Sequence, residues 1–241
     1  MLEVDVDPGL AAEISDYFSF YVPGYKFMPA YKNKVWDGKI KLFNRMNGEL
    51  NAGLYVYLIK FAAERGYEVD TEETDYGLPI LSENIDTNVF NSFLEVSGLP
   101  FMPREYQYDA VVTALNRGRG ILLSPTGSGK SFIAYLIIKY YMTMIDENQK
   151  ILIIVPTTSL VEQMVSDFED YGMLTDNSVH KIYSGKDKNT DKRVTVSTWQ
   201  SIYKFPPAWF KKFGMVIGDE CHGFKSKSLS SIMNKATEAK Y

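Results

Sequence analysis

Short aliphatic runs alternate with segments of helical pattern along the second half of this 241-residue chain. From residue 120 onwards the runs are GILLS, ILIIVP, HKIYS, RVTVST and MVIGDE. Strands that are aliphatic along their whole length are typical of parallel sheets buried on both faces, and the intervening helices supply the covering layers. The sequence therefore predicts an α/β fold for residues 99–241, with a parallel sheet and helices on both faces.

The first part of the chain has a different pattern. Helical spacing in PGLAAEISDYFSF precedes the alternating run KIKLF and an Asn-Gly turn in NRMNGEL. A second helical segment, GLYVYLIKFAAERGY, is closed by Gly66. These elements predict a small α+β domain. Because proline and glycine cluster in SGLPFMP, residues 97–103, we expect the domains to be 1–98 and 99–241.

Charge is distributed unevenly between these two parts. Residues 1–98 carry 8 Lys and Arg against 16 Asp and Glu, a balance of −8, whereas residues 99–241 carry 18 against 14, a balance of +4. All eight basic residues of the first part lie between Lys26 and Arg65, with only three acids among them. The net charge of −4 argues against a uniformly basic nucleic-acid binder, but a local basic patch still attracts phosphate.

The bulk features indicate a soluble protein of the cytoplasm. Cys221 is the single cysteine, so an intrachain disulfide is impossible and a reducing compartment fits. The acidic start MLEVDVDPGL lacks the pattern of a signal peptide, and the longest aliphatic run, ILIIV, is too short to cross a bilayer. We expect no membrane partner.

The stretch SPTGSGKS, residues 124–131, has the features of a phosphate-binding loop. It lies between the run GILL and an apolar helical segment, with Ser124 where the general pattern has its first glycine. Glycines let successive backbone N–H groups turn towards phosphates, and the following helix adds positive charge at its N-terminus. We expect ATP to bind Pro125, Thr126, Gly127, Ser128, Gly129, Lys130 and Ser131, with Lys130 at the β- and γ-phosphates and Ser131 ligating Mg²⁺. The alternative is an ordinary Gly/Ser loop.

An acid pair follows the last aliphatic run. Asp219 is expected to hold Mg²⁺ through its water shell, and Glu220 to orient and deprotonate the attacking water. Lys130, Asp219 and Glu220 are thus the predicted catalytic residues. A solvated acid pair at a strand end is the alternative, and the phosphate-binding loop upstream weighs against it. His222 is a lone histidine, a type that is usually structural.

The combination of SPTGSGKS and DECH resembles motifs I and II of the DExH branch of superfamily-2 helicases. PREYQ resembles the adenine-recognition motif, which implicates Arg104 and Gln107, while VPTTSLVEQ and VSTWQSI resemble strand-contacting motifs. These stretches cover residues 103–222. The resemblance implies a RecA-like fold and contacts from Thr157, Thr158 and Thr198 to a nucleic-acid backbone. Threonines at such positions are equally suited to capping helices.

Two further stretches resemble the UvsW family, the recombination and repair helicases of tailed bacteriophages. They are ILIIVPTTSLVEQM with the following DF, residues 151–168, and GYKFMPAYKNKVWDGKIKLF, residues 24–43. This resemblance implies ATP-driven remodelling of branched or forked DNA and of RNA–DNA hybrids, in the host cytoplasm if a phage encodes the chain. The chain ends nineteen residues after His222. We therefore expect the N-terminal portion of a helicase, with its first RecA-like domain incomplete and a second RecA-like domain as a missing partner.

In the N-terminal domain, lysines are interleaved with aromatic residues. The lysines expected to contact nucleic acid are Lys32, Lys34, Lys39 and Lys41. Trp36 and Phe43 either stack on bases or fill a small core, and for Trp36 we favour the core. Gly38, in WDGK, is expected to adopt the left-handed conformation of a turn.

Because the resemblance implies an arginine from the second RecA-like domain, we expect the chain alone to bind ATP, to hydrolyse it very weakly and not to unwind DNA. Two alternatives are a non-catalytic DNA-binding module that uses nucleotide as a switch, and a motor fragment of a restriction-type translocase.

Overall fold

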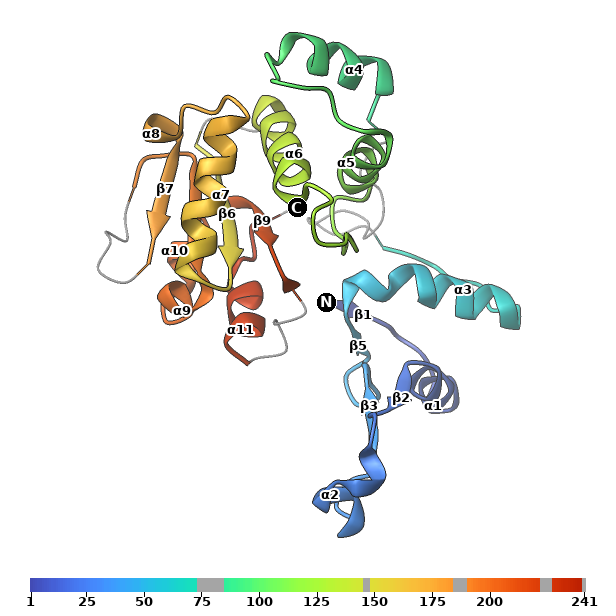
Figure 1. Cartoon of the computed structure of the whole chain (residues 1–241). Coiled ribbons are helices and arrows are strands. Elements are labelled where there is room, and N and C mark those ends of the chain that lie inside the picture. The colour runs from blue at the N-terminus through green and yellow to red at the C-terminus, as the bar shows by residue number, and fades with distance from the viewer. Residues whose placement is uncertain (73–84, 145–147, 184–189, 222–226, 240–241) are drawn as a thin grey trace. The chain divides into compact units, whose positions relative to one another are not determined.

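The chain forms two compact units, Met1–Leu81 and Ser82–Tyr241. The computed structural model describes residues 1–72, 85–144, 148–183, 190–221 and 227–239 (Figure 1). The division falls before helix α4 (Thr87–Val96), whereas the sequence placed the boundary at 98/99. It falls there because Phe90 and Leu94 of α4 are buried in the core of the second unit. Each unit is described by itself.

The first unit is built on a small antiparallel sheet packed against two helices. Its sheet has the strand order β1-β5-β4, and its core gathers seven buried hydrophobic residues. The elements are β1 (Leu2–Glu3), α1 (Pro8–Tyr17), β4 (Phe43–Asn44), β5 (Glu49–Leu50), η2 (Ala52–Leu54) and α3 (Tyr55–Arg65). Gly66 ends α3 with a φ of +71°, which confirms the predicted glycine cap. This is the predicted small α+β unit.

A two-stranded antiparallel ribbon extends from this sheet and is here called the arm, residues 19–41. It consists of β2 (Ser19–Tyr21), η1 (Tyr25–Phe27), α2 (Pro29–Lys32) and β3 (Lys39–Lys41), with β2 paired to β3 (Figure 1). Gly38 has a φ of +82°, as predicted, and a Cβ there would lie 2.3 Å from the Tyr25 ring. Only glycine therefore fits this close approach.

The second unit contains the predicted parallel sheet, with strand order β7-β8-β6-β9. The strands are β6 (Lys150–Val155), β7 (Val179–Ile182), β8 (Val194–Thr198) and β9 (Phe213–Gly218). The helices beside α4 are α5 (Glu105–Arg117), α6 (Lys130–Met144), α7 (Thr158–Asp170), α8 (Thr175–Ser178), α9 (Trp199–Ile202), α10 (Pro207–Phe210) and α11 (Lys227–Lys235). Within the described residues, no helix is both long and apolar enough to cross a membrane.

Alternate residues of the central strand β6 face two separate cores. Ile151 and Ile153 pack with α4, α5, α6 and α7, whereas Leu152 and Ile154 pack with α9, α10 and α11. This alternation explains why the strand is aliphatic along its length, because both faces of the sheet are covered. The predicted helices on both faces are confirmed.

One predicted strand is not formed. Residues 120–124, the run GILLS, have no strand structure, and Ile121 and Leu123 are 74% and 95% exposed. A strand requires a hydrogen-bonded neighbour, and among the described residues β9 pairs only with β6. The aliphatic pattern was therefore insufficient to predict a strand here, since pairing depends on contacts distant in sequence.

Candidate ATP site

The phosphate-binding loop leads directly into α6. Gly127 and Gly129 have left-handed φ values of +79° and +76°, the conformation in which glycine is favoured. A Cβ on Gly129 would lie 2.5 Å from Nε2 of Gln107, whereas a Cβ on Gly127 would meet nothing within 4 Å. The Ser128 hydroxyl donates to the Pro125 carbonyl at 2.7 Å. The loop thus turns sharply and leaves open space beside Gly127.

Helix α5 holds this loop through the Ser128 carbonyl. The Gln107 amide donates from Nε2 to that carbonyl at 2.9 Å, and its Oε1 accepts from the Arg104 backbone N–H at 3.0 Å. The Tyr106 hydroxyl donates to the same carbonyl at 2.9 Å. Gln107 is only 7% exposed, and Arg104 is exposed at the start of α5. Gln107, which the sequence associates with adenine, here links α5 to the loop.

Tyr106 is a contact of the loop that sequence reasoning missed. It directly precedes Gln107, but a tyrosine on the first turn of a helix carries no pattern that marks it as part of a phosphate site.

Lys130 and Glu220 meet, although 90 positions separate them in sequence. Nζ of Lys130, at the start of α6, donates to Oε1 of Glu220, just after β9, at 2.6 Å. The hydrogen bond that Lys130 donates to Glu220 raises the pKa of Lys130. Negative charge on Glu220 and Asp219 raises it further, whereas desolvation lowers it. The structure therefore brings the predicted phosphate-binding lysine to the predicted general base.

The backbone of Glu220 is strained where it makes this contact. Its φ is +52°, in the left-handed region that costs a residue with a side chain about 1–2 kcal/mol. The preceding Asp219 N–H continues the sheet ladder by donating to the Ile154 carbonyl at 2.9 Å. The turn away from the sheet thus occurs at Glu220, and strain of this kind is concentrated at functional sites.

The predicted magnesium ligands come from the same two elements. Ser131 follows Lys130 on α6, and Asp219 precedes Glu220 after β9. A hydroxyl and a carboxylate are hard oxygen donors, the type that Mg²⁺ prefers, so this donor set fits the ion. The Ser131 hydroxyl forms a hydrogen bond with the Tyr171 hydroxyl at 3.0 Å, which the sequence did not indicate. His222 lies outside the described residues.

The three threonines expected at the nucleic-acid backbone differ in exposure. Thr157 caps α7, because its Oγ1 accepts from the Leu160 N–H at 3.3 Å, and both Thr157 and Thr158 are exposed. Thr198 is 4% exposed, and its Oγ1 forms a hydrogen bond with Oγ of Ser201 at 2.8 Å. Thr157 is therefore a helix cap. Of the three threonines, only Thr157 and Thr158 are exposed at the surface.

The lysines of the N-terminal domain also differ among themselves. Lys32 and Lys34 are exposed, whereas Lys41 forms an ion pair with Asp37 at 2.9 Å, and Nζ of Lys39 lies 5.2 Å from the centre of the Tyr21 ring.

The two aromatic residues considered for the core have different outcomes. Phe43, for which the sequence left both positions open, is 3% exposed and belongs to the core. Trp36 is half-buried and is not a member of the core cluster, so its prediction was wrong. The physical reason is that Trp36 lies in the arm, where its indole Nε1 donates to the Lys39 carbonyl at 2.8 Å.

Two protein families match separate parts of the chain. The family described as "DNA helicase UvsW, N-terminal" matches residues 1–72, and the family described as "Type III restriction enzyme, res subunit" matches residues 100–241. Both matches agree with the division of the chain into a small N-terminal part and a larger second part.

Among curated relatives, "ATP-dependent DNA helicase uvsW" of Enterobacteria phage T4 is 38% identical over 241 residues, covering 97% of this chain and 47% of the relative. "DNA 3'-5' translocase XPB2" of Sulfurisphaera tokodaii is 26% identical over 215 residues, covering 89% of this chain and 41% of the relative. The chain thus spans less than half the length of both.

The solved structure of the UvsW helicase from bacteriophage T4 superposes with a TM-score of 0.85 at 35% identity. The match covers 99% of this chain and 86% of that chain. It confirms the predicted RecA-like α/β fold with a small N-terminal domain.

Proposed function

The chain belongs to the UvsW family of superfamily-2 helicases, and from that premise we propose that it is the N-terminal portion of an ATP-dependent DNA helicase of recombination and repair. The observation that carries this proposal is the 2.6 Å contact between Lys130 and Glu220. A lysine at the start of a helix after a glycine loop and an acid after a parallel strand are the two halves of an ATP-hydrolysing site.

Each residue of the site has a role that follows from its chemistry. The loop from Pro125 to Ser131 receives the phosphates, and Lys130 leaves Glu220 to pair with the β- and γ-phosphates. Glu220 then accepts a proton from the water that attacks the γ-phosphorus, while ADP departs. Ser131 would ligate Mg²⁺ and Asp219 would hold it through its water shell, and the bound ion would neutralise charge on the transferred phosphoryl group.

Recognition of adenine is proposed for Arg104 and Gln107. One N–H of the Gln107 amide donates to the Ser128 carbonyl, and its oxygen accepts from the Arg104 backbone N–H. An amide has a second N–H and a second lone pair, and these are the groups proposed to meet the base. Arg104 is exposed and already available.

The proposed substrate is branched or forked DNA, with RNA–DNA hybrids as a possible second substrate. Exposed Thr157 and Thr158 at the start of α7 and the exposed lysines of the arm support backbone contacts that do not read sequence. A second RecA-like domain is the proposed partner, because a charge supplied across the ATP cleft accelerates such reactions by about 10³–10⁵.

ATP hydrolysis tests this proposal. The chain is assayed with and without forked DNA, beside Lys130→Ala and Glu220→Gln, and again after addition of a separately produced second RecA-like domain from a UvsW relative. We expect very weak turnover alone, a DNA-dependent increase on addition of the second domain, and loss of turnover in both variants.

Two results would contradict the proposal. Turnover that persists in Lys130→Ala would place hydrolysis elsewhere. ATP binding with no turnover, even when DNA and the second domain are present, would instead support a nucleotide-switched DNA-binding module.

A restriction-type translocase is the second candidate, favoured by the match of residues 100–241 to the type III restriction family. The match of residues 1–72 to the UvsW N-terminal family weighs against it. Strand separation on forked DNA by the reconstituted protein would support the helicase, whereas ATP-driven movement along duplex DNA without separation would support the translocase.

A further inference from the structure

The arm exposes apolar surface without contributing to a core. None of the hydrophobic residues from 19 to 41 is buried, whereas Phe18 and Phe43 on either side of the arm are 6% and 3% exposed. At the tip, Phe27 and Val35 are 80% and 81% exposed. Exposed apolar surface that is concentrated in one segment indicates a binding site, because a partner that covers it removes apolar area from water.

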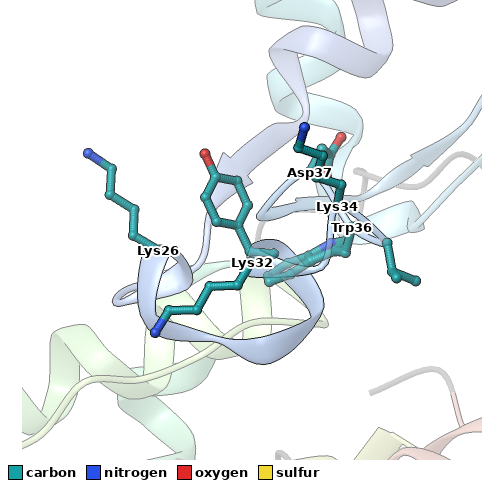
Figure 2. A pocket seen from close by; sticks show the side chains of 7 residues that line it. Lys26, Lys32, Lys34, Trp36 and Asp37 are labelled. Carbon is teal, nitrogen blue, oxygen red and sulfur yellow. The ribbon is translucent and has the colours of Figure 1, made fainter.

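Near the tip the surface of the arm has an open hollow of about 520 Å³. This size falls within the range of about 300–1,000 Å³ that is usual for ligand sites. The hollow is lined by Lys26, Tyr31, Lys32, Lys34, Val35, Trp36 and Asp37. Figure 2 shows Lys26 and Lys32 extending to the left of the Trp36 ring, and Lys34 and Asp37 above it.

The aromatic rings at the hollow are held in place before any ligand arrives. Trp36 is fixed by the hydrogen bond from its indole Nε1 to the Lys39 carbonyl. Tyr31 packs edge-on against Tyr25 at 4.7 Å between ring centres, and Tyr25 stacks on Tyr21 at 4.6 Å. Rings that are already ordered lose little conformational freedom when a flat ligand stacks on them.

Charge in the hollow is strongly positive. The Lys41 ammonium pairs with the Asp37 carboxylate, and the hydrogen bond from Lys41 lowers the pKa of Asp37, so this acid is already compensated. Among the described residues, no carboxylate lies within ion-pair distance of Lys26, Lys32 or Lys34. Three ammonium groups therefore surround an aromatic hollow without an acid to neutralise them.

We propose that this hollow binds one unpaired nucleotide of a single nucleic-acid strand. A base stacks on Trp36, and Lys26, Lys32 and Lys34 neutralise the flanking phosphates. An acidic peptide would match the charge but not the flat rings, and a duplex hides the faces of its bases. The inference rests on the proposed function, because it assumes a nucleic-acid partner, and it names an unpaired strand as what the N-terminal unit grips.

Fluorescence anisotropy with the whole chain tests the stacking. The probes are a labelled oligothymidine, an abasic strand with the same number of phosphates, and a blunt duplex. Wild type is expected to bind the oligothymidine about tenfold more tightly than the abasic strand, as one stacked base predicts. Trp36→Leu should abolish that difference, and Trp36→Phe, which keeps a ring, should restore part of it.

The lysines are tested through salt dependence. Lys32→Ala and Lys34→Ala should weaken binding of both single strands, and each should lower the slope of log affinity against log salt by about 0.7. Lys60→Ala is the matched control, since Lys60 lies in the same unit with a side chain 66% exposed and paired with Glu64, and it should leave binding unchanged.

The contradicting results are specific. A preference for the oligothymidine that survives in folded Trp36→Leu overturns the inference, as does equal binding of the intact and abasic strands by wild type. Polyglutamate competing as well as oligothymidine would also overturn it in favour of an acidic peptide. ATP binding by the same wild-type sample distinguishes failure of this inference from failure of the proposed function. If the sample binds ATP but does not prefer the oligothymidine to the abasic strand, only nucleotide binding at the hollow is refuted. If it does not bind ATP, the proposed function is refuted.

Discussion

Replacing Gly129 by alanine should destabilise the second unit more than replacing Gly127 by alanine. Both glycines have left-handed backbones, where a side chain costs about 1–2 kcal/mol. Their surroundings differ, because a Cβ at position 129 would lie 2.5 Å from Nε2 of Gln107, whereas one at position 127 meets nothing within 4 Å. The two variants therefore share the backbone cost and differ in the clash.

The size of the clash follows from how Gln107 is held. The side chain is 7% exposed, and both ends of its amide are hydrogen-bonded, so it cannot move aside without losing these bonds. Two hydrogen bonds at about 0.5–1.5 kcal/mol each give an additional cost of about 1–3 kcal/mol. We expect a loss of about 1–2 kcal/mol for Gly127→Ala and about 2–5 kcal/mol for Gly129→Ala.

Urea denaturation followed by circular dichroism measures both losses, with the slope against urea checked for constancy. Gln107→Ala provides the control, because in that background the cost of Gly129→Ala should fall to that of Gly127→Ala. Equal losses for the two glycine variants, or an unchanged cost of Gly129→Ala without Gln107, would refute the reasoning.

Other predictions concern the rest of the site and the sheet. Tyr171→Phe leaves the Ser131 hydroxyl without its partner and should tighten Mg²⁺-dependent ATP binding by up to about fivefold in a magnesium titration; weaker binding would contradict this. The pKa of Lys130 is raised by its ion pair with Glu220, so this pair stabilises the fold while Lys130 is protonated. In urea denaturation over an alkaline pH series, wild type should therefore be more stable than Glu220→Gln below the ordinary lysine pKa. The difference should disappear as pH rises through the raised pKa of Lys130. Leu123→Ala, at a 95% exposed position, should change the free energy of unfolding by less than about 0.5 kcal/mol. Leu152→Ala, at a fully buried position, should lower it by about 2–5 kcal/mol. Equal losses would indicate that residues 120–124 form a buried strand after all.

The features that could be predicted from the sequence are those with a local cause. The strands β6 and β9 are aliphatic because both of their faces are covered, so their pattern is visible in a few residues. Gly66 and Gly38 adopt the left-handed conformations that only glycine takes readily. The meeting of Lys130 with Glu220 was predictable because the glycine loop leads into a helix, the acid pair follows β9, and each pattern is visible in a few residues.

The features that were missed depend on partners distant in sequence. Residues 120–124 have the composition of a strand, but pairing decides the outcome. Tyr171 reaches Ser131 from the end of α7, forty positions away, and no local pattern marks that contact. Trp36 was expected in the core because large aromatic residues usually are, yet the arm places it beside a hollow lined by lysines.

ATP binding at equilibrium by wild type, Lys130→Ala and Glu220→Gln tests the central claim most directly. Lys130 is paired with Glu220, so ATP must draw the lysine away from a carboxylate. The account predicts that Lys130→Ala loses binding and that Glu220→Gln binds ATP at least as tightly as wild type, because the competing charge is gone. Weakening in Glu220→Gln as severe as in Lys130→Ala, or retained binding in Lys130→Ala, would contradict it.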